Sequence, residues 1–141
     1  MIPAERKYLI FSISGRLFAF DLSQVAEVSE PQRTWPVPAV PLCYRGAMNF
    51  HGSIVAVMDL AAFMGFPANQ VHEKLIVLDT GIAALAFLVE RVLRIVAEHQ
   101  AELREAPKES FATAMIALPE GVATLLDAES IATQATEEIN R

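Results

Sequence analysis

The sequence has very little cysteine and fewer basic than acidic residues. Cys43 is the only cysteine, so no disulfide can form within the chain and a reducing compartment is expected. Lys and Arg number 11 against 17 Asp and Glu, which gives a net charge of −6. Binding to nucleic acid requires a basic surface that neutralises phosphates, so this composition argues against a nucleic-acid partner.

Long apolar runs are also missing. The longest uncharged apolar run, Ile82–Val89, has eight residues, whereas a transmembrane helix needs roughly 20. The N-terminal residues do not resemble a secretory signal, because the apolar run after Lys7 is interrupted by Ser14, Gly15 and Arg16. We therefore expect a cytoplasmic protein without direct membrane insertion.

Groups that carry catalysis or bind metals are scarce. The histidines are His51, His72 and His99, with no pair spaced i, i+4, and a zinc site needs three or four ligands. Cys43 and His51 could in principle act as nucleophile and base, but Cys43 has no evident anion hole. The glycines form no phosphate-binding motif. The sequence thus predicts no catalytic residue, no metal site and no cofactor.

Short apolar segments separated by turn residues are abundant, and this pattern predicts an all-β protein. A chain of 141 residues with 53% hydrophobic residues suits one compact domain. Besides a short ribbon between Gly46 and Gly52, which are predicted turn glycines, the expected strands are Tyr8–Ile13, Leu17–Phe20, Val25–Ser29, Ile54–Met58 (buried on both faces), Lys74–Leu78, Ala83–Val89, Val92–Val96, Phe111–Leu118 and Val122–Leu126.

Two connections stand out between these strands. Four prolines between residues 31 and 41 predict an extended surface loop held to the body by Trp35, with a Pro-rich recognition segment as the alternative. Residues 97–110 are polar and predict a long solvated connection.

Three aspartates recur at the ends of predicted strands. Asp21, Asp59 and Asp127 each follow an apolar residue, and another apolar residue stands four positions later. This pattern predicts an N-cap with a hydrophobic staple, so that a short helical turn folds back over each strand. Gln24 could complete a capping box in the first turn. After Asp127, a C-terminal helix over residues 127–141 is predicted from apolar residues at every fourth position.

The stretch Tyr44–Leu60 contains the pattern R-G-x-x-N-x-x-G-x-x-x-x-V-x-D-L. This pattern resembles the signature of CheW-type chemotaxis coupling proteins, and the resemblance extends over roughly Lys7 to Ile131. The sequence departs from the family at His51, where the family usually has Arg, and at Ala56, where it usually has Pro.

The resemblance implies an all-β fold of two intertwined five-stranded Src-homology-3-like barrels within a single domain over residues 1–141. It places the first barrel at about residues 7–59, the second at about residues 73–126 and the C-terminal helix at residues 127–141. The three aspartate-capped turns derived above fit at the ends of these barrels.

The resemblance also implies a function. Proteins of this family are non-catalytic adaptors that couple the cytoplasmic tip of a chemoreceptor to the regulatory domain of a histidine kinase in two-component signal transduction. An apolar surface of the second barrel contacts the kinase in such proteins. The receptor-binding groove would be lined by the residues that match the family positions, which are Val25, Glu27, Val28, Arg45, Asn49 and His51.

Two alternatives stay open at this point. The first is a divergent CheW-like scaffold of a non-flagellar or alternative signalling array. The second, from another class of protein, is a small-ligand-binding β-barrel. His51 bears on the first alternative because histidine lacks the permanent charge and the five-donor fork of arginine, which makes the groove less positive.

Overall fold

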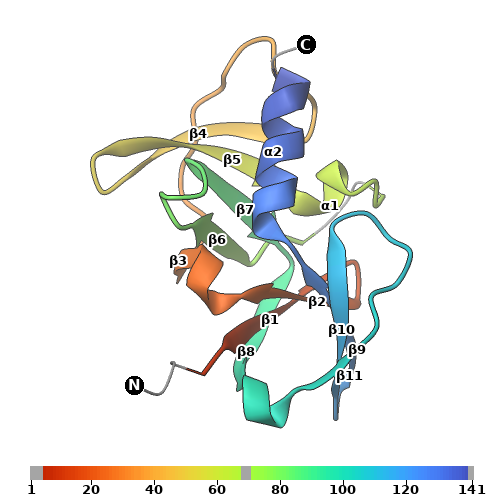
Figure 1. Cartoon of the computed structure of the whole chain (residues 1–141). Helices are drawn as coiled ribbons and strands as arrows, with labels where there is room; N and C mark the ends of the chain where they lie inside the picture. The colour runs from red at the N-terminus through yellow and green to blue at the C-terminus, as the bar shows by residue number, and fades with distance from the viewer. Residues whose placement is uncertain (1–4, 68–70, 140–141) are drawn as a thin grey trace.

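The computed structural model describes residues 5–67 and 71–139, and most of its regular structure is β-strand (Figure 1). A six-stranded sheet has the order β8-β1-β2-β11-β10-β9. Its strands are β1 (Lys7–Ile13), β2 (Arg16–Asp21), β8 (Arg91–Ala97), β9 (Glu102–Arg104), β10 (Ala112–Leu118) and β11 (Gly121–Leu126). A five-stranded sheet has the order β3-β6-β7-β5-β4. Its strands are β3 (Val25–Ser29), β4 (Tyr44–Phe50), β5 (Ser53–Asp59), β6 (Lys74–Leu78) and β7 (Leu85–Val89).

The helical segments are short except for the last one. They are η1 (Leu22–Gln24), α1 (Leu60–Phe63), η2 (Glu98–Gln100) and α2 (Ala128–Ile139). The all-β prediction with short capped turns and a C-terminal helix is therefore confirmed. The predicted helix extended to residue 141, and residues 140 and 141 lie outside the described part of the chain.

Each sheet combines strands from both predicted barrels, whose bounds at residues 7–59 and 73–126 stay a prediction. β1 and β2 belong with β8 to β11, whereas β6 and β7 pair with β3 and β5. β1 is buried along Tyr8–Ile13 and has a neighbour on each edge, β2 and β8.

The predicted connection over residues 97–110 contains two elements that sequence patterns did not indicate. It holds η2 and the three-residue strand β9, whose residues are all exposed. β9 pairs with β10 and is the last strand of the six-stranded sheet. An exposed strand shows no apolar alternation, so the usual pattern for a strand is missing there.

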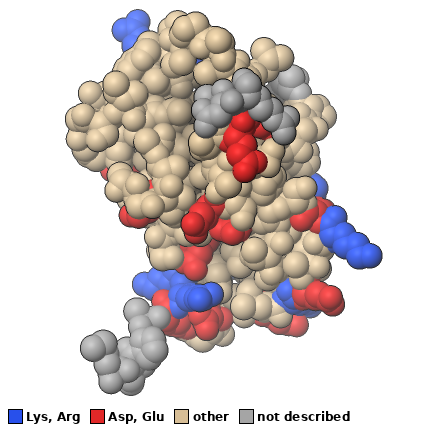
Figure 2. All heavy atoms as spheres, turned by 45° about the horizontal axis from the view of Figure 1, so that its top comes forward, with Lys and Arg blue, Asp and Glu red and all other residues tan. Residues whose placement is uncertain are grey.

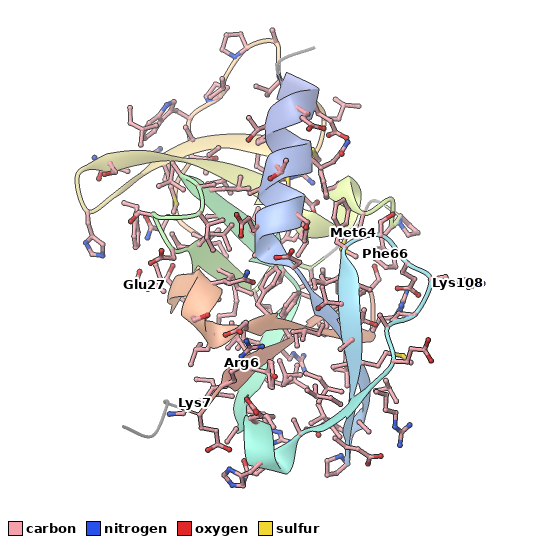
Figure 3. The ribbon with its side chains drawn as sticks, in the orientation of Figure 1. Arg6, Lys7, Glu27, Met64, Phe66 and Lys108 are labelled. Carbon is pink, nitrogen blue, oxygen red and sulfur yellow. The ribbon has the colours of Figure 1, made fainter. Side chains whose placement is uncertain are left out.

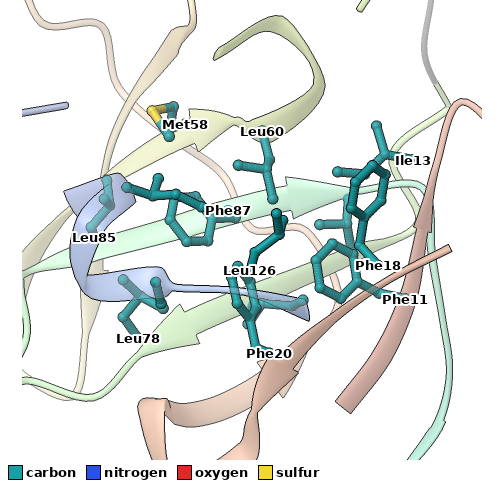
Figure 4. Packing of buried hydrophobic residues seen from close by; sticks show 14 of the residues in the cluster. Phe11, Ile13, Phe18, Phe20, Met58, Leu60, Leu78, Leu85, Phe87 and Leu126 are labelled. Atoms are coloured by element: carbon teal, nitrogen blue, oxygen red, sulfur yellow. The ribbon is translucent and has the colours of Figure 1, made fainter. Parts of the chain in front are cut away.

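The largest core cluster lies where the two sheets and α2 meet (Figure 4). Phe11 and Phe20 of the six-stranded sheet have ring centroids 4.9 Å apart, and Phe20 lies 5.6 Å from Phe87 of the five-stranded sheet. Buried aromatic pairs of this kind contribute beyond their apolar area. A separate cluster around Met48 and Val57 covers the opposite face of the five-stranded sheet.

The three predicted aspartate caps are present. Asp21 accepts a hydrogen bond from the Ser23 amide at 3.0 Å, and Asp59 accepts one from Ala62 at 3.3 Å. Asp127 accepts one from the Glu129 amide at 3.1 Å. The apolar residues before and after each aspartate belong to the largest core cluster or pack against it, namely Phe20 with Val25, Met58 with Phe63, and Leu126 with Ile131.

The proline-rich segment is held to the body by its backbone. Trp35 and Ala47 exchange two backbone hydrogen bonds of 2.9 Å, while the Trp35 side chain stays exposed. Gly46 makes this contact feasible, since a Cβ at that position would lie 2.2 Å from the Trp35 carbonyl oxygen. The loop prediction is thus confirmed, but peptide hydrogen bonds rather than burial of the indole fix its position.

Charged side chains are unevenly distributed over the surface. Figure 2, in which the top of Figure 1 is turned forward, shows few charged side chains over the upper part of the molecule. Residues 34–44 and 46–58 contain no Lys, Arg, Asp or Glu. Within the second segment, Ile54 is 70% exposed, so the predicted burial of Ile54–Met58 on both faces is wrong at its first residue, next to the β4–β5 turn.

Candidate functional site

The β4–β5 hairpin ends in a two-residue turn, His51-Gly52, between the paired residues Phe50 and Ser53. His51 has φ 49° and Gly52 has φ 85°. Positive φ at both central positions is the requirement of a type I′ turn, which matches the natural twist of the two strands. Asn49 supports the turn, because its Oδ1 accepts the Gly52 amide at 3.0 Å.

This turn brings His51 to Glu27 of β3. His51 Nε2 lies 3.6 Å from Glu27 Oε1, and the two side chains are 75% and 41% exposed. The imidazole also packs against Phe50, with ring centroids 4.3 Å apart. In Figure 3, Glu27 lies below the tip of the β4–β5 hairpin, at the outer edge of the five-stranded sheet. Residues 24 positions apart in sequence thus form one surface.

The predicted groove residues separate into groups. Glu27, Val28 and His51 are accessible at the edge formed by β3 and the hairpin tip, whereas Val25 packs against the largest core cluster. Asn49 is exposed and supports the turn. Among the six residues, the structure shows a side-chain contact only for Glu27 with His51 within the described part of the chain.

Unlike Glu27 and His51, Arg45 contacts a residue outside the predicted groove set, Asp59. Its Nη2 donates to Asp59 Oδ2 at 2.9 Å, and the Asp59 side chain is almost completely buried. Asp59 uses its other oxygen, Oδ1, to cap α1. His72 Nε2 lies 3.2 Å from Asp59 Oδ2, although this buried nitrogen lacks the geometry of a hydrogen bond to any described residue. Asp59 is therefore both a cap and the counter-ion of Arg45.

Sequence reasoning missed the part that His72 takes in this arrangement. His72 comes from the connection before β6, and no spacing along the chain links it to Arg45 or Asp59. Arg45 and His72 lie at the rim of a pocket of about 320 Å³ on the outer face of the five-stranded sheet. The pocket is lined by Pro31, Gln32, Thr34, Arg45, Met48, Val57, His72, Leu75 and Leu88.

A second hollow of about 450 Å³ lies between the segment after α1 and the segment before β10. Figure 3 shows Met64 and Phe66 on one side of this region and Lys108 on the other. Arg16 pairs with both carboxylate oxygens of Glu109 at 3.1 Å and lies over the Phe66 ring. Because Arg16 and Glu109 pair with each other, the rest of the lining of this hollow is chiefly aromatic.

Cys43 does not have the environment of a catalytic nucleophile. Cys43 is buried, and burial raises the pKa of its thiol, which disfavours the thiolate that a nucleophile needs. Within residues 5–67 and 71–139, no cluster of His, Cys, Asp and Glu could hold a metal ion. No helix in the same part of the chain is long and apolar enough to cross a membrane.

The two sheets, with their short capped turns, define a Src-homology-3-like β fold. The crystal structure of the scaffolding protein TtCheW from Thermoanaerobacter tengcongensis has this fold. It superposes with a TM-score of 0.77 at 18% identity, over 91% of this chain and 92% of that chain. A family model of the CheW-like domain matches residues 7–136, and the protein belongs to this family.

Relatives with known names support the assignment. The chemotaxis protein CheW of Thermotoga maritima is 32% identical over 70% of this chain and 68% of its own length. The chemotaxis protein CheW of Bacillus subtilis is 22% identical over 76% of this chain and 70% of its own. Protein PilI of Pseudomonas aeruginosa is 28% identical over a shorter part, 45% of this chain. The predicted membership of a chemotaxis adaptor family is confirmed.

Proposed function

We propose that this protein is a non-catalytic adaptor that couples the cytoplasmic tip of a chemoreceptor to the regulatory domain of a histidine kinase. Membership of the CheW-like family supports the class of function. The observation that carries the receptor half of the proposal is the contact between Glu27 and His51, which joins β3 to the tip of the β4–β5 hairpin.

The receptor tip binds along this edge in our proposal. Val28 is 37% exposed on the other face of this edge strand and supplies an apolar contact, while Glu27 and His51 supply polar ones. An apolar contact with a polar rim is the usual composition of an interface between proteins that associate reversibly. Arg45 lies outside this edge in our proposal, since its Nη2 donates to the buried Asp59.

The kinase regulatory domain binds on the other sheet. β8 is an edge strand of the six-stranded sheet, and it exposes Leu93 by 36% and Ile95 by 51%. Leu93 is the extra residue of a bulge in β8, between Arg94 opposite Ile10 and Val92 opposite Phe11, and with Ile95 it adds exposed apolar area to this edge. Edge strands with exposed apolar residues are common protein-binding elements. Two surfaces on different sheets allow one adaptor to hold both partners.

The experiment measures binding of the full chain to each partner separately, by biolayer interferometry. We expect Val28→Glu to weaken binding of a chemoreceptor tip at least about tenfold, as loss of a buried apolar contact does, and to leave kinase binding unchanged. Ile95→Glu should show the opposite pattern. Each variant is thus the matched control for the other, since both place a glutamate on an exposed strand position.

Two results would contradict the proposal, and a third would report only on folding. Wild-type protein that binds neither partner would refute the adaptor function itself. Variants that lose both partners equally would indicate damaged folding, which circular dichroism checks. Variants that fold and lose neither partner would refute the two surfaces while leaving the adaptor function in place.

A further inference from the structure

The pocket of about 320 Å³ that Arg45 and His72 border has an apolar floor. Met48, Val57, Leu75 and Leu88 supply the floor from β4, β5, β6 and β7, on the sheet face that points away from the shared core. The mouths of curled sheets are common ligand sites, and pockets for small molecules begin at roughly 300 Å³. The volume therefore suits a small ligand.

The rim carries nitrogen donors on one side of this floor. Arg45 is half exposed, and only its Nη2 makes a hydrogen bond among the described residues, to Asp59 at 2.9 Å. The remaining guanidinium N–H groups are available to a ligand. His72 Nε2 is buried next to Asp59 Oδ2 without a hydrogen bond in the described part of the chain. A buried polar atom of this kind calls for a partner.

We propose that this pocket binds a small carboxylic acid with a short unbranched apolar chain. The planar guanidinium of Arg45 matches a carboxylate in shape and charge, and the His72 ring lies beside it at the rim. The chain of the ligand would cover Met48, Val57 and Leu75. Neither acid nor base chemistry is involved; the ligand is only bound.

Asp59 limits the affinity. Its carboxylate already offsets one positive charge at the rim, so an incoming anion gains little from net charge. Asp59 is nevertheless buried and occupied by Arg45 and the Ala62 amide, so that a ligand meets the nitrogen donors rather than the carboxylate. For a ligand of so few atoms, a dissociation constant on the order of 1 mM is expected.

This inference does not rest on the adaptor function. The pocket is formed by Arg45, His72 and apolar residues on the outer face of the five-stranded sheet. The proposed receptor edge is formed by Glu27, Val28 and His51. The two proposals are tested with different probes, and either can fail without the other.

The test is a titration of the full chain with hexanoate, hexanamide and acetate, followed by amide chemical shifts. Hexanoate should give saturable shifts at Met48, Val57 and Leu75. Hexanamide has the same chain without the charge and should bind at least about tenfold more weakly, since charged hydrogen bonds are the stronger ones. Acetate has the charge without the chain and should also bind more weakly. Absence of saturable shifts with hexanoate, or equal binding of hexanamide, would refute the proposal.

Variants locate the site. Arg45→Gln should reduce hexanoate binding at least about tenfold, whereas Arg33→Gln should not, because Arg33 lies on the adjacent loop and does not line the pocket. Leu88→Phe reduces the pocket volume, leaves Arg45 and His72 in place, and should also weaken binding. If Arg45→Gln does not fold, the proposal is still tested by Leu88→Phe and by the comparison of the three ligands on wild-type protein. Unchanged binding by Leu88→Phe would place the ligand elsewhere and refute the assignment.

Discussion

Gln24 and Asp127 are 103 positions apart, yet the Gln24 amide nitrogen Nε2 donates to Asp127 Oδ1 at 3.3 Å. Gln24 Oε1 also accepts the backbone amide of Ala128 at 3.3 Å. β2 and β11 pair in parallel with Phe20 opposite Leu126, so the capped turns that follow them begin side by side. Gln24 therefore joins two capped turns and does not complete the capping box predicted within the first.

Replacing Gln24 by Ala should lower the free energy of unfolding by about 0.5–1.5 kcal/mol for the hydrogen bonds it loses. Urea denaturation measures this change. Gln100→Ala is the control, because Gln100 is exposed in η2 and should change stability by less than about 0.5 kcal/mol. Equal effects of the two substitutions would contradict the stabilising role of Gln24.

The same substitution should raise the pKa of Asp127. Burial by itself raises this pKa, but hydrogen bonds from Ser130, Gln24 and Glu129 outweigh burial and lower it below its ordinary value. A lowered carboxyl pKa stabilises the fold above the unfolded pKa, and this contribution is lost as the pH falls through the folded pKa. An NMR titration in which Gln24→Ala left the Asp127 pKa unchanged would exclude Gln24 as a cause.

Asp59→Ala should destabilise the protein more than Asp21→Ala does. Both lose an N-cap, which costs about 0.5–2 kcal/mol. Asp59 is buried and also accepts from Arg45, and a hydrogen bond to a charged group contributes about 1.5–3 kcal/mol more. Thermal and urea unfolding of both variants compare the two caps. A smaller loss for Asp59→Ala would show that the Arg45 pair contributes nothing net.

Gly46→Ala should be more destabilising than Gly15→Ala. Both glycines have positive φ, 131° and 75°, so both substitutions incur backbone strain of roughly 1–2 kcal/mol. Only at Gly46 would the new Cβ also collide with the Trp35 carbonyl oxygen, whereas nothing lies within 4 Å at Gly15. Unfolding measurements on both variants test this, and protection of the Trp35 amide from hydrogen exchange should fall only in Gly46→Ala.

The pKa of Glu120 is lowered to about 2, first by the hydrogen bonds from Arg94 and then by a backbone hydrogen bond. Arg94→Gln should therefore shift the Glu120 pKa upward, toward its ordinary value of 4.5. In the wild-type protein, Glu120 keeps its charge as the pH falls until about 2. Carboxyl NMR titration of both proteins measures the shift, and Arg104→Gln, which removes an arginine paired with Glu102, serves as the control.

His51→Arg should strengthen binding of a chemoreceptor tip by roughly 0.5–1 kcal/mol, the range of exposed ion pairs. Arginine restores a permanent charge beside Glu27, from which His51 Nε2 is 3.6 Å away. The gain should shrink as salt rises, because exposed charges are screened. Binding measured at low and high salt checks this, and an equal affinity for both proteins at low salt would exclude the electrostatic effect.

The sequence by itself determined the elements of this protein. Turn residues between short apolar runs located nearly all the strands, and aspartate followed by a staple of apolar residues located the three capped turns. These signals are local, because capping and alternation depend on residues only a few positions apart. The order of motifs around Arg45 and Asp59 also sufficed to recognise the family.

Only the tertiary structure decided which strands are partners and which residues form the sites. β1 pairs with β8, and β2 pairs with β11, across most of the chain. Burial of their apolar faces requires these distant partner strands, which a local sequence pattern cannot identify. For the same reason Gln24 reaches Asp127, and His72 reaches Asp59. Arg45, which the family motif assigned to the groove, also pairs with the buried carboxylate of Asp59, since a charge removed from water needs a partner nearby.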